Sequence, residues 1–188
     1  MMKTINYKIE FFSNWHCGSG LAAGADVDEL VVKENDGLPF VPGKTIKGLL
    51  REAYENVCAY KHLSSNTDAI FGYFDDANKM GKGKVFFSNA ILKDEESKKI
   101  VACGFIPFLY QSFSSTAIDD NGIAKNRSLR KIETCVPCSL YGTIDNIPDE
   151  FVEENIKDAM RFIKRLGVGR NRGYGRCKIS IVNEYGKN

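Results

Sequence analysis

The sequence lacks any long apolar run. Nowhere in its 188 residues do uncharged apolar residues stand together over the length, about 18, that a membrane-spanning helix requires. The first dozen residues, MMKTINYKIEFF, contain no apolar stretch of signal-peptide length. We therefore expect neither export nor membrane insertion, and we expect a cytoplasmic protein.

Two further absences limit the class of fold. The sequence has no internal repeat that would suggest a solenoid. Among its six cysteines only Cys135 and Cys138 have zinc-site spacing, and no second pair matches them, so zinc binding is not favoured there. A chain of this size needs no disulfide framework, so we expect reduced thiols. A hydrophobic content of 43% is ample for a packed core and predicts one globular domain over residues 1–188.

Alternating apolar residues predict the strands. A first strand is expected over residues 5–12, with Tyr7, Ile9 and Phe11 on one face. Further strand-like runs are residues 84–92, 100–113, 133–144 and 177–182. Between them we expect a flexible connection over residues 75–84 and a charged turn over residues 94–99.

Two stretches have apolar residues at helical spacing. One helix opens at Pro42 and Gly43, with a core face of Ile46, Leu49, Leu50, Ala53 and Val57, and the other follows Pro148. The order strand, helix, strand, insertion, strand, helix, strand predicts an α+β fold of ferredoxin-like type, similar to the RNA-recognition motif. Its antiparallel sheet carries two helices, with insertions at about 17–40 and 93–135.

No carboxylate occurs between Arg161 and Lys178, although this stretch has seven basic side chains. Within it, LGVGRNRGYGR interleaves four glycines with Arg170, Arg172 and Arg176. Glycine lets backbone approach a ligand closely, and the arginine fork suits phosphate. In a chain of net charge +2, so localised a positive charge indicates a polyanionic partner.

Two other basic groups are candidate phosphate contacts. Lys44, Lys47 and Arg51 share the polar face of the first helix, near its N-terminus, where free amides favour anions. Arg127 and Arg130 belong to a basic segment that either follows a nucleic-acid backbone or forms a surface hairpin.

Carboxylates and one histidine are the candidates for chemistry. Asp26 and Asp28 lie in a loop of small residues, where they either hold a divalent ion and accept a proton or are ordinary solvated residues. His16 follows the first strand and is either a general acid or base, an RNA contact, or a hydrogen-bonded structural residue.

Several segments, taken together and in order, resemble the RAMP superfamily of CRISPR-associated proteins. They are WHCGSG at residues 15–20, the long segment 28–53, IFG with GKVFFSNAIL, SLRKIETCVPCSLYGTI, and the closing LGVGRNRGYGRCKISI. The chain is most similar to the repeated backbone subunits of type III effector complexes.

This resemblance implies a subunit that binds guide RNA, assembles with copies of itself and with other effector subunits, and pairs with complementary target RNA. It implies that a loop aspartate, here Asp26 or Asp28, cleaves target RNA with Mg²⁺ or another divalent cation, only in the assembled complex. Two alternatives stay open. The chain is a non-catalytic structural subunit, or a metal-independent endoribonuclease that processes guide RNA with His16.

Overall fold

A central strand with alternating burial organises the fold. The computed structural model describes residues 3–20, 27–64, 67–74, 80–148 and 153–183. Strand β1 (Lys3–Phe11) buries every second side chain from Ile5 to Phe11, which confirms the predicted apolar face. It pairs antiparallel with β7 (Ser139–Ile147) on one side and with β8 (Cys177–Val182) on the other.

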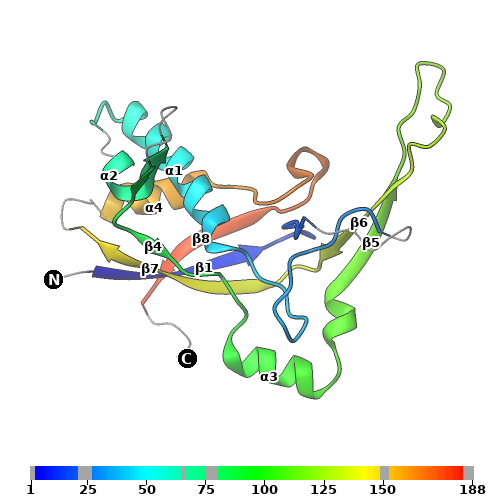
Figure 1. Cartoon of the computed structure of the whole chain (residues 1–188), viewed down its shortest axis with the longest axis horizontal. Coiled ribbons are helices and arrows are strands. Elements are labelled where there is room, and N and C mark those ends of the chain that lie inside the picture. The colour runs from blue at the N-terminus through cyan, green and yellow to red at the C-terminus, as the bar shows by residue number, and fades with distance from the viewer. Residues whose placement is uncertain (1–2, 21–26, 65–66, 75–79, 149–152, 184–188) are drawn as a thin grey trace.

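The completed sheet has the strand order β4-β7-β1-β8, because the short β4 (Phe86–Phe87) adds to the outer edge of β7. Helices α1 (Gly43–Tyr60) and α4 (Glu153–Phe162) lie on one face of this sheet (Figure 1). Strand order and helix placement are those of a ferredoxin-like α+β fold, as the sequence predicts.

The two helices bury one side each. Ile46, Leu50 and Val57 of α1 pack in the same core as the apolar side chains of α4. Leu49, which the helical spacing places in that core, is only half-buried and lies at its margin. None of the helices within the described residues is long and apolar enough to cross a membrane.

An arm extends from the sheet between β4 and β7. It contains α3 (Asp94–Ala102), the short 3₁₀ helix η1 (Ile106–Leu109) and a hairpin of β5 (Tyr110–Ser115) and β6 (Arg130–Cys135), which projects away from the sheet (Figure 1). The sequence predicts a charged turn at 94–99 and a strand-like run that starts at residue 100. Both predictions are wrong for residues 94–102, because these residues form α3. Three acidic residues in its first turn complement the helix dipole, a signal that the apolar pattern alone does not contain.

A second small unit follows α1. It consists of α2 (Thr67–Phe71), β2 (Gly72–Phe74) and β3 (Met80–Lys82), and the two strands pair as a hairpin. The expected flexible connection at 75–84 therefore includes a strand, while residues 75–79 lie outside the described residues.

Candidate nucleic-acid interface

The loop between α4 and β8, residues 166–176, is fixed by backbone hydrogen bonds to the segment that follows β1. Val168 N donates to His16 O at 2.9 Å, and Gly175 N donates to Asn14 O at 2.8 Å. Gly167 and Gly175 have positive φ, and a Cβ on either would overlap a carbonyl oxygen. These two glycines thus allow close packing of backbone on backbone.

This anchoring presents the loop arginines to solvent. Arg170 and Arg172 bound the short 3₁₀ helix η2 (Arg170–Arg172), and they and Arg176 are exposed. The Arg165 guanidinium donates to the carbonyl of Arg170. Tyr174 holds the loop against the arm, with its ring 5.8 Å from the ring of Phe113. The result is a positively charged surface beside the arm.

His16 lies beneath the loop and is fully buried. Its Nδ1 is 2.6 Å from the carbonyl oxygen of Glu133, which can only accept, so Nδ1 carries the proton. In the neutral ring Nε2 is therefore an acceptor, and it has no hydrogen-bond partner among the described residues. A carboxylate oxygen, Glu29 Oε2, lies 3.7 Å from Nε2, at ion-pair distance for a protonated ring.

Asp28 is held against strand β6. Its Oδ2 accepts from Lys131 N at 2.7 Å, and its own backbone N donates to Lys131 O at 2.9 Å. Asp26 lies outside the described residues. Glu133 of β6 also holds this segment in place, because its carboxylate accepts hydrogen bonds from Val31 N at 3.0 Å and from Lys33 Nζ at 2.8 Å. The segment that carries Asp28 is thus fixed beside His16.

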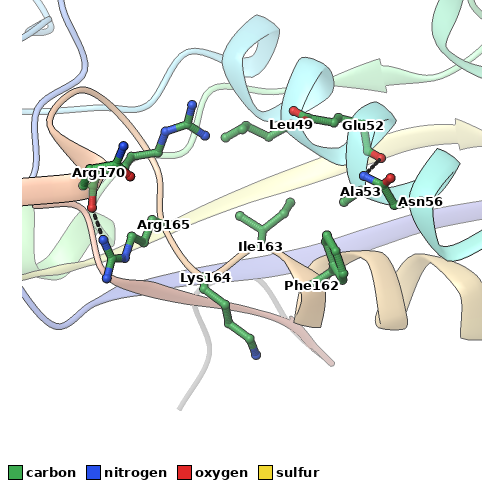
Figure 2. Close-up of a pocket in the computed structure, with 10 residues that line it drawn as sticks. Leu49, Glu52, Ala53, Asn56, Phe162, Ile163, Lys164, Arg165 and Arg170 are labelled. Carbon is green, nitrogen blue, oxygen red and sulfur yellow. Dashed lines mark hydrogen bonds between the residues drawn. The ribbon is translucent and has the colours of Figure 1, made fainter. Parts of the chain in front are cut away.

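Three adjoining cavities form a groove over these residues. The first, about 240 Å³, lies between Asp28, Glu29 and His16, and shares His16 and Val168 with the second, about 280 Å³. The second shares Leu49 and Arg170 with the third, about 300 Å³, between α1 and the end of α4 (Figure 2). We call this the loop groove; it runs from the carboxylates, past the arginine loop, to Phe162.

The other predicted cations lie away from the loop groove. Thr45 and Leu49 line it, whereas Lys44 and Lys47 lie about 100–160° around α1 from those two residues, at 3.6 residues per turn. The first amide of α1, Gly43 N, already donates to Asn89 Oδ1 at 3.0 Å. This bond occupies part of the expected anion site.

Arg51 has structural partners. Its guanidinium donates to Glu55 Oε1 at 3.0 Å, to Asp68 Oδ1 at 2.8 Å and to Gly72 O at 2.8 Å. Arg127 and Arg130 are exposed on the arm, Arg127 near its tip and Arg130 at the start of β6. The structure thus separates the predicted basic residues into three groups.

The residues next to Asp28 provide an incomplete set of metal ligands. Among the described residues, no group of three or more His, Cys, Asp and Glu side chains is arranged to hold a metal ion. A divalent cation at Asp28 would therefore need further oxygen ligands, from Asp26, RNA or water. Cys135 and Cys138 are free thiols, and the hydrogen bond to Cys138, together with burial, raises the pKa of Cys135 and opposes the thiolate that zinc requires.

The sequence did not predict several residues that line the loop groove. Glu29 is one of several neighbouring acidic residues, and the apolar side chains of Leu49 and Val168 do not indicate a binding site. Phe162 had a usable signal: it is an aromatic residue outside the apolar face of its helix, and it is 59% exposed.

Comparisons with known proteins agree with this geometry. The model of the RAMP superfamily matches residues 8–178. No protein of curated function matches the sequence significantly. Among solved structures, a chain in the cryo-EM structure of the type III-B Cmr-beta bound to cognate target RNA has the same fold. Its TM-score is 0.71 at 10% sequence identity, with 95% of this chain and 97% of that chain covered. The protein therefore belongs to the RAMP superfamily.

Proposed function

We propose that this protein is an RNA-binding backbone subunit of a type III CRISPR effector complex, with guide RNA and complementary target RNA as ligands. The observation that carries the proposal is the loop groove, in which a glycine-fixed loop presents exposed arginines beside adjoining cavities. Membership of the RAMP superfamily and the shared fold with a chain of an RNA-bound type III-B structure support it. Copies of this chain and other effector subunits are the proposed protein partners.

RNA binding is tested with the three loop arginines. Each arginine that neutralises a phosphate of single-stranded RNA contributes roughly 0.7 to the slope of log affinity against log salt. Replacing Arg170, Arg172 and Arg176 with alanine should therefore weaken binding and reduce that slope by about 2. Fluorescence anisotropy with a labelled single-stranded RNA at several salt concentrations measures both.

The matched control removes the same charge elsewhere. Lys82, Lys98 and Lys99 are exposed on β3 and α3, and their triple alanine variant should keep the wild-type slope. An arginine variant that is folded and indistinguishable from this control would exclude the loop from the RNA site.

We further propose that the subunit cleaves target RNA in the assembled complex. Asp28 supports this role because its carboxylate is oriented by Lys131 N at the mouth of the loop groove. A bound divalent cation would supply Lewis-acid activation of the phosphate or of a nucleophile. Asp28, with Asp26, would hold that cation or accept the proton from the attacking hydroxyl.

Cleavage is tested in the assembled complex with paired target RNA. Chelation should abolish it, and Asp28→Ala, Asp26→Ala or the double variant should slow it by about a hundredfold or more, while target binding is kept. A double variant that cuts at the wild-type rate would exclude both aspartates. Wild type that binds but never cuts would indicate a structural subunit, and guide processing that survives the chelator but not His16→Ala would favour metal-independent chemistry.

A further inference from the structure

The third cavity of the loop groove, about 300 Å³, has an apolar floor and a charged rim. Leu49 and Ala53 of α1 face Phe162 and Ile163 at the end of α4, and Arg170 reaches across toward Leu49 (Figure 2). Its size is at the lower end of the range, roughly 300–1,000 Å³, that is usual for small-ligand sites. We call it the Phe162 pocket.

Phe162 is the least expected residue of this pocket. It is the last residue of α4, and it lies outside the buried face formed by Ile156, Ala159 and Met160. Phe162 is 59% exposed, so most of it does not contribute to the core. An exposed aromatic ring at the wall of an apolar pocket offers a flat surface for stacking.

The rim determines what can stack there. Lys164, Arg165 and Arg170 supply positive charge, and Glu52 is the one carboxylate among the described residues that line the pocket. A ligand with a flat aromatic body and an attached anionic group fits both features. A nucleotide has that chemistry, because its base stacks and its phosphate pairs with arginine.

The Phe162 pocket adjoins the second cavity of the loop groove, because Leu49 and Arg170 line both. A strand whose phosphates lie along the arginine loop would therefore bring its bases to Phe162. We propose that the Phe162 pocket takes one unpaired base of the bound RNA, stacked on Phe162, with the adjoining phosphate on Arg170 or Arg165. This inference rests on the proposed RNA binding and adds a base subsite to it.

The test compares two exposed phenylalanines. Phe162→Ala should weaken single-stranded RNA binding by about tenfold, because it removes the ring on which one base stacks. Phe162→Trp keeps a stacking surface and should restore affinity. Phe86→Ala removes an equally exposed ring, 60% against 59%, from β4, and should have no effect. Circular dichroism and thermal melting verify that each variant is folded.

A fluorescent base reports the contact directly. RNA with 2-aminopurine placed at successive positions should show quenching at one position on wild type and Phe162→Trp, and none on Phe162→Ala. If the wild-type protein does not bind RNA, both the proposed function and this inference are overturned. RNA affinity equal in Phe162→Ala and Phe86→Ala would overturn this inference alone.

Two further outcomes assign the pocket to another ligand, and each overturns the inference. If free AMP displaces the 2-aminopurine signal at the same concentration as the RNA itself, the pocket is a mononucleotide site. If Phe162→Ala keeps RNA affinity but loses association between copies of the chain or with other subunits, it is a protein contact.

Discussion

Gly173 and Gly175 lie two residues apart in the arginine loop, and both have left-handed backbone, with φ of +93° and +66°. Their surroundings differ. A Cβ on Gly175 would overlap the carbonyl of Leu166, whereas a Cβ on Gly173 would meet no described atom within 4 Å. The pair therefore separates the cost of backbone conformation from the cost of close packing.

We expect Gly173→Ala to destabilise the protein by about 1–2 kcal/mol, the cost of a left-handed alanine. Gly175→Ala should destabilise the protein by about 1–3 kcal/mol more than Gly173→Ala, because its methyl group also overlaps fixed backbone. Denaturant unfolding monitored by circular dichroism measures the difference. Equal free energies of unfolding would mean that the loop shifts to admit the methyl group and is not fixed as described.

At the scale of the element, Arg51 connects α1 to the small unit of α2, β2 and β3 through Asp68 and Gly72. Arg51→Ala removes these bonds but no contact of the loop groove. Amide hydrogen exchange in residues 67–74 and 80–82 should accelerate, while RNA affinity stays at the wild-type level.

Lys47→Ala, one turn earlier on α1, is the comparison variant and should leave that exchange unchanged. If Arg51→Ala instead lowers RNA affinity and its salt slope without altering exchange, Arg51 contacts RNA, and its bonds to Asp68 and Gly72 are replaceable.

At the scale of the whole molecule, the tip of the arm is separable from the sheet. Its hydrogen bonds join tip residues to one another, such as Thr116 Oγ1 with Ser128 Oγ at 2.6 Å and Lys125 N with Ala117 O at 2.8 Å. Replacing residues 117–127 with an Asn-Gly turn should shift Tm by less than about 2 °C, because the segment is almost wholly exposed.

Replacing residues 117–127 with this turn also removes Arg127. If Arg127 contacts RNA phosphate, the salt slope of RNA binding should fall by about 0.7. Arg127→Ala in the full-length arm should give the same change. A large loss of Tm would show instead that the tip packs on the body of the protein.

The sequence by itself determined the elements whose signals are local. The alternation from Ile5 to Phe11, the apolar spacing in α1 and α4, and the run that forms β8 predict the ferredoxin-like order, because burial on one face imposes a period of 2 or 3.6. Where the apolar signal was weak, as in α3, the prediction was wrong.

Only the tertiary structure decided which side chains meet. His16, Asp28 and Arg170 line one groove because β1 pairs with β8, and because β6 holds the segment of Asp28. Lys44 and Lys47 are equally basic but lie on another side of α1. Leu49, which the helical spacing places in the core, is half-buried and lines the groove. Such proximity depends on pairing between residues more than a hundred positions apart, which no local pattern in one sequence contains.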